Sequence, residues 1–340
     1  MSTAVTYYVI LLLVYMGCNS MMVLGLNLQF GMAAIINFSY YILVAVGGYA
    51  AGLTVLGPPQ SAQSGGTEYL FGFTLPWPLP VLAAVLAGAV AALIVGIIAV
   101  RRLRSDYLAV ATLVVGDVTW LLTGNTTSVV NGWNGLTGIP QPLIDQLPVT
   151  QLQYQWIYLG IVMFFTLVSF LVMQRLTYSP FGRSLRAIRE NEYTAAACGK
   201  DVFRLRMTAM MVGGAIAAVG GALFIEFIGT VQPSMWNVPE TFVIFAALIV
   251  GGRGNNWGAV LGAILVPVGF LEATRLLPQN WIISQSLLDP LRWIIIGTVL
   301  ILVLYFRPQG IIPERKARFP ELGHRAPSEA HRVLMGEVSE

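Results

Sequence analysis

Carboxylates within apolar stretches are the first residues in this sequence that could do chemistry. Asp117 lies in the middle of one such stretch, and Glu226 and Glu272 lie near the ends of two others. A charge inside a bilayer is costly, so these residues mark solute pathways or contacts between helices. We expect Asp117 to hydrogen-bond inside the helix bundle, on a pathway or next to one. The two glutamates could instead snorkel to the interface or pair with Arg275 and Arg292.

The sequence lacks the residue patterns of several enzyme classes. No G-x-x-x-x-G-K-[ST] loop precedes either lysine, Lys200 or Lys316, so the chain cannot hydrolyse a nucleotide by that route. Both histidines, His324 and His331, lie in the C-terminal tail, which leaves no histidine cluster in the apolar stretches. We therefore expect a chain that is not an enzyme, has no metal site and binds no cofactor itself.

The composition indicates an integral membrane protein. The 340 residues are 56% hydrophobic and 10% charged, and no charged side chain occurs before Glu68. A soluble domain carries roughly a quarter charged residues. The two cysteines, Cys18 and Cys198, show no spacing that pairs them, so we predict neither a disulfide nor a metal site.

Apolar stretches recur along the chain at lengths that suit a bilayer, which needs about 20 apolar residues per helical span. They cover residues 5–26, 28–56, 78–100, 108–123, 155–173, 207–228, 241–251, 257–274 and 291–306. The pattern predicts an all-α polytopic membrane protein with about nine transmembrane helices, within a range of roughly eight to ten. Stretches 108–123 and 241–251 are short, so either they are broken or they extend into flanking polar residues.

The basic residues predict the orientation. If the helices alternate, 17 of the 19 lysines and arginines fall on one side of the membrane. The polar segments 57–77 and 124–154, on the other side, contain none. Because positive charge accumulates on the cytoplasmic side, we expect the N-terminus outside and the C-terminus in the cytoplasm.

Two regions follow from this organisation. Residues 1–313 form a transmembrane permease domain, which includes a basic cytoplasmic segment at about 174–206. Residues 314–340 form a polar cytoplasmic tail whose composition is typical of disorder.

The basic segment contains a predicted amphipathic helix over 180–199. Pro180 can begin a helix and Gly199 can end it. The apolar stripe contains Phe181, Leu185, Ile188 and Ala195, and the basic stripe contains Arg183, Arg186 and Arg189. Two roles fit. The arginines could hold the helix on anionic headgroups. Alternatively, Leu185 and Ile188 could fill a groove on a cytoplasmic partner.

Glycines and other small residues form a second pattern. Gly48/Gly52, Ala217/Gly221 and Gly258/Gly262 have the four-residue spacing that lets helix backbones approach closely in a bilayer. The glycine-rich segment 251–258 is either a tight turn or a broken helix near a pathway.

Six segments, in order, carry a resemblance to a known family. They are Leu26-Asn27-Leu28 with Gly31 and Gly48-Tyr49; Leu103-Arg104-Ser105-Asp106-Tyr107-Leu108-Ala109-Val110; Asn131-Gly132 with Gly135-Leu136-Thr137-Gly138-Ile139-Pro140; Ser179-Pro180-Phe181-Gly182-Arg183 running on to Glu190; Gly251-Gly252-Arg253-Gly254; and Arg307-Pro308-Gln309-Gly310. The sequence resembles the M-type permease of branched-chain amino acid ABC (ATP-driven) importers.

The resemblance implies the function and the partners. Such a permease pairs with an H-type permease chain, two cytoplasmic ATPases that bind ATP, and an extracytoplasmic substrate-binding protein. It lies in the bacterial plasma (inner) membrane as a multi-pass protein, and no nucleic-acid partner is expected. The coupling residues that it implies are Phe181, Arg183, Leu185, Arg186, Ile188, Arg189, Glu192 and Gly199. The six-residue interval from Tyr193 to Gly199 resembles the looser E-A-A…G signature of import permeases, but the match is imperfect because Glu192 lies seven residues before Gly199.

One segment departs from the family pattern. Where the family often has a Gly-His pair, the chain reads Asn37-Phe38-Ser39-Tyr40-Tyr41. Asn37, Ser39 and Tyr40 are, with Asp117, our pathway candidates, and substrate choice could differ here. Import of urea or short amides therefore stays open, as does a secondary amino-acid transporter, which would need no ATPase.

Overall fold

The computed structural model describes residues 3–58, 69–100, 105–144, 148–270, 294–295, 297–298 and 301–314. Within these residues, six helices are long and apolar enough to cross a membrane: Ala4–Met32, Leu79–Ile98, Tyr107–Asn125, Gln151–Tyr178, Val202–Ile228 and Pro233–Gly251. Shorter apolar helices cover Tyr40–Val55 and Asn256–Gly269. The all-α polytopic architecture is therefore confirmed. The predicted stretches 257–274 and 291–306 lie partly outside the described residues.

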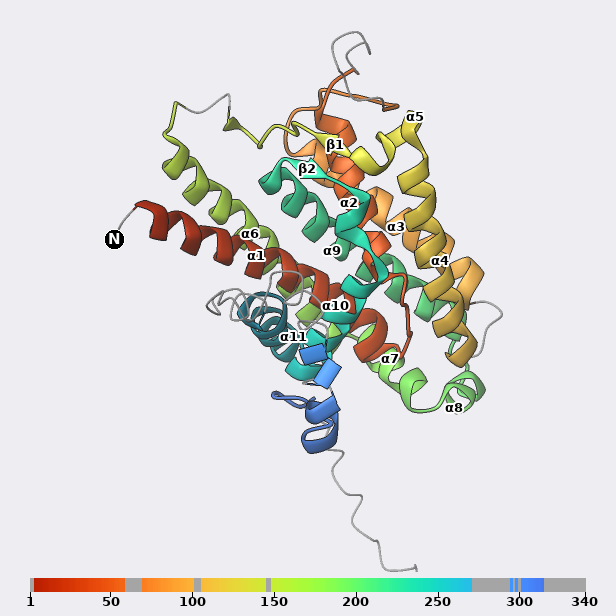
Figure 1. Ribbon diagram of the computed structural model, residues 1–340. Helices are drawn as coiled ribbons and strands as arrows, with labels where there is room; N and C mark the ends of the chain where they lie inside the picture. Colours follow the sequence, from red (N-terminus) through yellow and green to blue (C-terminus); the bar gives the residue numbers. More distant parts are fainter. Residues whose placement is uncertain are drawn as a thin grey trace, which may run out of the picture.

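The elements follow one another along the chain as in Figure 1. The helices are α1 (Thr3–Leu26), the π-helical turn η1 (Asn27–Met32), α2 (Tyr40–Val55), α3 (Leu79–Val100), α4 (Ser105–Asn125), α5 (Thr127–Val130), α6 (Gln151–Tyr178), α7 (Pro180–Glu190), α8 (Glu192–Ala197), α9 (Val202–Ile228), α10 (Val238–Gly251), α11 (Asn256–Ala263) and the π-helical η6 (Ile264–Phe270). Short 3-10 turns cover Gly132–Asn134 and Pro233–Trp236, and the strands are β1 (Leu136–Thr137) and β2 (Thr230–Val231).

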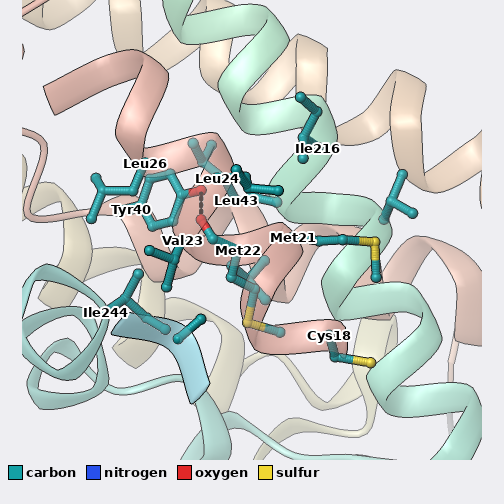
Figure 2. Close-up of a cluster of buried hydrophobic side chains, with 14 of the residues drawn as sticks. Cys18, Met21, Met22, Val23, Leu24, Leu26, Tyr40, Leu43, Ile216 and Ile244 are labelled. Carbon is teal, nitrogen blue, oxygen red and sulfur yellow. Dashed lines mark hydrogen bonds between the residues drawn. The ribbon is translucent and has the colours of Figure 1, made fainter. Parts of the chain in front are cut away.

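Helix α9 is the centre of the molecule and contacts α1, α2 and α3. A Cβ added to Gly221 would lie 2.1 Å from the Val44 carbonyl oxygen, so α9 and α2 approach backbone to backbone. The predicted role of the Ala217/Gly221 pair in close packing is thus confirmed. Figure 2 shows the adjoining core, where residues of α1 and α2 meet Ile216 of α9.

The predicted stretch 28–56 is not one helix, which corrects the sequence-based expectation. Its first residues continue α1 as η1, residues 33–39 are irregular, and α2 begins only at Tyr40. The Asn37 side chain accepts a hydrogen bond from the Ser39 backbone N–H at 3.1 Å. Such local side-chain bonds compete with helical backbone bonds, which accounts for the break.

Two short predicted stretches extend into polar residues rather than break. Stretch 108–123 becomes α4, and stretch 241–251 becomes α10 preceded by the 3-10 turn at Pro233–Trp236. The segment 251–258 is a tight turn, because α10 ends at Gly251 and α11 begins at Asn256.

The predicted helix 180–199 is two helices, α7 and α8, which is a second correction. Asn191 separates them with an extended backbone, and its side-chain oxygen accepts from the Thr194 N–H at 3.0 Å. Asparagine at this position caps a new helix, so the chain turns instead of continuing. Ser179 similarly caps α7 through the Gly182 N–H at 3.3 Å, with Pro180 in the first turn.

The polar segments gather at opposite ends of the bundle. Strand β1 pairs antiparallel with β2 at the end that holds α5, whereas α7 and α8 lie at the other end (Figure 1). Helices α1 and α6 run parallel, because Gly17 lies against Val162 near the middle and the Thr177 hydroxyl contacts the Met32 sulfur further along. The N-terminus therefore lies at the β1–β2 end.

Candidate coupling site and pathway residues

A buried polar cluster surrounds the break between η1 and α2. Asn27, Gln29, Asn37 and Ser39 are each at most 1% exposed. The Asn37 amide donates to Gln29 Oε1 at 3.2 Å, and the Ser39 hydroxyl donates to Asn37 Oδ1 at 2.6 Å. Gln29 Nε2 in turn donates to the Met210 carbonyl of α9 at 3.0 Å. The cluster thus ties the irregular segment to the central helix.

The break lies well inside the bundle. The Phe38 backbone N–H donates to the Thr112 hydroxyl at 3.0 Å, seven residues into α4, or roughly 10 Å along its axis. Irregular backbone at membrane depth is tolerated only inside protein or along a water-filled cavity. The structure therefore brings Asn37 and Ser39 together where a pathway could open, although both are buried in this conformation.

Tyr40 follows the break at the start of α2. Its ring is 0% exposed, and its hydroxyl donates to the Met22 carbonyl oxygen of α1 (Figure 2). Tyr40 is thus a hydrogen-bonded core residue in this conformation.

Arg189 on α7 joins the basic segment to the broken span. One guanidinium nitrogen donates to the Gly31 carbonyl of η1, and the other meets Glu314 Oε2 at 2.6 Å. Arg186 Nε lies 2.9 Å from the second oxygen of the same carboxylate. One acidic residue therefore holds two arginines of α7 against η1, in a partly buried site where charge-assisted bonds are strong.

A second layer of side chains secures η1 from the other side. Asn27 Oδ1 accepts from the Gly254 N–H at 2.8 Å, and Asn27 Nδ2 donates to Asn256 Oδ1 at 2.9 Å. Asn256 Nδ2 donates to Gln174 and Thr177 of α6. Hydrogen bonds therefore link the α10–α11 turn, η1 and α6 to one another.

The segment around Arg307-Pro308-Gln309-Gly310 completes this junction. The Ile311 N–H donates to the Val250 carbonyl and the Ile312 N–H to the Gly251 carbonyl, both at 2.9 Å. This pairing positions Glu314 beside α7. Four segments that carried the resemblance thus meet at one junction, which sequence alone did not indicate.

The two apolar residues central to α7 face this chain. Leu185 is 0% and Ile188 is 2% exposed. This corrects the expectation that they fill a groove on a partner, since burial in their own chain makes them unavailable. The shared apolar stripe itself is confirmed, because Phe181 and Ala195 are also turned inward.

The exposed surface of this segment lies on the other side and on α8. Arg183 is exposed, and Tyr193 of α8 is 84% exposed. Glu192 is ion-paired with Arg206 of α9 at 2.9 Å, and Gly199 has a left-handed φ of 78°. These residues belong to α7, α8 and the turn after α8, at the end of the bundle opposite β1 and β2 (Figure 1).

Asp117 lies on an exposed face of α4. It shares that face with Val110, Val114 and Leu121, which are 65%, 52% and 47% exposed. Its carboxylate forms no hydrogen bond or ion pair with any described residue, so the expected bond inside the bundle is not found in this part of the chain. A carboxylate directed at lipid is costly, so this face needs a polar neighbour.

A cavity of about 420 Å³ lies between α2 and α4. Its lining is mainly apolar and includes Tyr49 and Trp236, both nearly buried. The Tyr49 hydroxyl and the Trp236 indole nitrogen have no hydrogen-bond partner among the described residues. Small-molecule sites combine such apolar walls with a few polar groups, so the cavity suits an aliphatic solute.

Sequence reasoning missed the uncharged members of these networks. Asn27, Gln29 and Asn256 stand in or beside apolar stretches, but the candidates within those stretches were the carboxylates and the segment Asn37–Tyr40. Amides within such stretches were the available signal. Glu314 was assigned to the tail, and no local pattern separates it from that composition.

Comparisons with known proteins agree with this architecture. Residues 8–304 match the family described as branched-chain amino acid transport system / permease component. The chain is 29% identical over 338 residues to the probable branched-chain amino acid transport permease protein LivM of Methanocaldococcus jannaschii, covering 92% of this chain and 95% of that protein.

Other relatives belong to the same group. The high-affinity branched-chain amino acid transport system permease protein LivM of Escherichia coli is 28% identical, over 85% of this chain and 66% of its own length. The permease LivH of the same organism is 31% identical over 43% of this chain and 45% of its own length. No solved structure matches the chain significantly. The chain belongs to the branched-chain amino acid transport permease family.

Proposed function

We propose that this chain is the M-type subunit of an ATP-driven importer that moves branched-chain amino acids across the bacterial inner membrane. The observation that carries the proposal is Arg189, which bonds an exposed helical segment directly to the broken span. Relatives named LivM support the substrate class. The apolar cavity beside Tyr49 suits an aliphatic solute.

The chain needs partners for this activity. The LivH relatives support a second, H-type permease chain. The α4 face that exposes Asp117 is the surface we assign to that chain. Two cytoplasmic ATPases would bind the ATP, because this chain has no phosphate loop, and an extracytoplasmic binding protein would deliver the solute.

The mechanism we propose is alternating access driven from α7 and α8. An ATPase docks on the exposed surface that contains Arg183 and Tyr193, and its closure displaces α7. Because Arg189 bonds the Gly31 carbonyl, the displacement reaches η1 and then residues 33–39. Rearrangement of the Asn37–Ser39 bonds would open the outer side of the pathway, with Tyr40 as its hinge.

The orientation follows from the same proposal. The β1–β2 end faces outside with the N-terminus, and α7 and α8 face the cytoplasm. Single cysteines at Asn131 and Ser184, with Cys18 and Cys198 replaced, test it in intact cells. An impermeant thiol reagent should label Asn131→Cys and spare Ser184→Cys, and the reverse pattern overturns the orientation.

The function itself is tested by reconstitution. The chain should be purified with its co-expressed permease and ATPase partners, inserted in vesicles and given a loaded binding protein. We expect leucine uptake that depends on ATP and on the binding protein. Uptake driven by an ion gradient without ATP would instead indicate a secondary transporter.

A further inference from the structure

Glu226 is a buried carboxylate that the proposed mechanism does not use. It lies near the end of α9, is 1% exposed, and neither carboxylate oxygen has a hydrogen-bond partner among the described residues. It therefore does not reach the membrane interface by snorkelling, which was one of the two roles that its position in the sequence allowed. An unpaired carboxylate away from water is costly, so the site requires a partner.

Glu226 lines a cavity of about 180 Å³ at the β1–β2 end of the bundle. Three chain segments close around the end of α9 to form it. The Leu75 N–H donates to the Thr54 carbonyl of α2 at 2.9 Å, and Gln141 Nε2 donates to the Phe227 carbonyl of α9 at 3.3 Å. The cavity is thus built from fixed elements.

Unpartnered polar atoms gather around this cavity. Four buried side-chain atoms that form no hydrogen bond with a described residue belong to residues that line it. They are both carboxylate oxygens of Glu226, Oε1 of Gln141 and Nε1 of Trp77. The cavity therefore has three unpaired hydrogen-bond acceptors and one unpaired donor, which favours a ligand that is rich in donors.

The rest of the lining adds to this excess of hydrogen-bond acceptors over donors. Four prolines line the cavity, and proline has no backbone N–H to donate to Glu226. They are Pro76, Pro80, Pro140 and Pro142. The remaining wall is aliphatic, with Val55 and Ile144 among its residues. A ligand with an ammonium group and an apolar side chain matches both features.

We infer that this cavity is a binding site for a free aliphatic amino acid, with its ammonium group on Glu226 and Gln141. The indole N–H of Trp77 would receive the carboxylate, and the aliphatic wall would hold the side chain. The volume corresponds to roughly six water molecules, which suits a small solute and excludes a peptide. This inference rests on the proposed function, because it concerns the same substrate class.

The test is leucine binding to the purified permease complex without binding protein, measured by calorimetry. We compare L-leucine with 4-methylpentanoate, which lacks only the amino group. Leucine should bind and 4-methylpentanoate should not. Glu226→Gln should weaken leucine binding about tenfold to a hundredfold, because it removes the charge-assisted bonds. Glu240→Gln, which changes an acidic residue at the start of α10 outside this cavity, should bind as the wild type does.

Three results would overturn the inference. The first is equal leucine affinity in Glu226→Gln and in the wild type. The second is competition by sodium, which would indicate an inorganic cation site. The third is an equal loss of leucine binding in Arg275→Gln or Arg292→Gln, which would make Glu226 the ion-pair partner of that arginine. Arg275 and Arg292 lie outside the described residues. Uptake of leucine by the wild-type vesicles, measured in parallel, separates failure of this site from failure of the proposed function.

Discussion

Helices α9 and α4 are both apolar membrane spans, yet they are placed in opposite ways. In the most apolar stretch of α9, 67% of the residues are buried within this chain, whereas in that of α4 only 22% are. Helix α9 presents glycine and alanine to its neighbours, such as Gly221 against Val44. Helix α4 directs valines and Asp117 away from the chain.

The difference shows that residue size, rather than hydrophobicity, distinguishes a scaffold helix from a surface helix in a membrane. Lipid is as apolar as leucine, so apolar character does not drive helices together there, and close backbone packing does. The inner helices fix the shape of this chain. The face of α4 is left for another molecule, and Asp117 requires that molecule to be polar at that depth.

The largest expected effect comes from filling the α9 contact. In Gly221→Leu, the new Cβ would lie 2.1 Å from a backbone oxygen of α2, and neither helix can yield locally. Overpacking typically costs about 1–3 kcal/mol, and a backbone clash places this variant at or above the upper end. Folded yield and melting temperature in detergent should both fall sharply.

Gly160→Leu is the matched control. Nothing lies within 4 Å of a Cβ at that position on α6, so yield and melting temperature should match the wild type. Equal loss in the two variants would mean that the α9 packing does not explain the difference between the helices.

The second effect concerns Arg189, which links exposed α7 to the buried helices. Arg189→Gln removes the bond to Glu314 and weakens the one to Gly31, which together contribute about 1.5–3 kcal/mol. We expect the ATPase still to bind but leucine uptake per ATP hydrolysed to fall at least about tenfold. Arg175→Gln, which changes an exposed arginine at the end of α6 outside the docking surface, should retain coupling. Full coupling in Arg189→Gln would contradict the proposed route of motion.

The third effect concerns Asp117, on the exposed face of α4. Asp117→Asn keeps a hydrogen-bonding group and should assemble and transport nearly normally. Asp117→Leu should impair transport and weaken association with the second permease chain, by about 0.6–2 kcal/mol, as polar contacts between membrane helices do. Co-purification ratios and uptake rates measure both. Normal assembly and transport in Asp117→Leu would show that α4 simply faces lipid.

The smallest effect is expected from Leu121→Ala, one turn from Asp117. Leu121 is 47% exposed, so the stability of the isolated chain should change by less than about 0.5 kcal/mol. In the assembled complex the loss should be larger, because the partner buries this residue. The melting temperatures of the isolated variant chain and of the assembled variant complex, each compared with the wild type, test whether this face of α4 binds the second permease chain.

The periodicity of apolar and small residues predicted much of the fold. The stripe of Phe181, Leu185 and Ile188 predicted which face of α7 is apolar, and small-residue spacing predicted that the Ala217/Gly221 helix packs closely against a neighbour. Both signals are local, because helical spacing decides which side chains share a face. The turn at 251–258 was likewise among the alternatives that the glycines allowed.

The errors have a shared physical cause. Burial of Leu185 and exposure of Asp117 depend on which elements lie beside them. Helical spacing predicts which side chains share a face, but not which neighbour that face contacts. The break at 33–39 was hidden because its residues are largely apolar, while the amides that stabilise it act across the chain, as Gln29 does on α9. Glu314 meets Arg189 only because Ile311 and Ile312 pair with the end of α10.

The position of Glu314 also decides how the C-terminus can be handled in the laboratory. Its carboxylate pairs with both Arg186 and Arg189 of α7. A chain cut after Pro313 would lose the shared counter-ion of these two arginines, whereas a chain cut after Glu314 would keep it. A stop codon in place of Glu314 should therefore couple ATP hydrolysis to leucine uptake less well than a stop codon directly after Glu314.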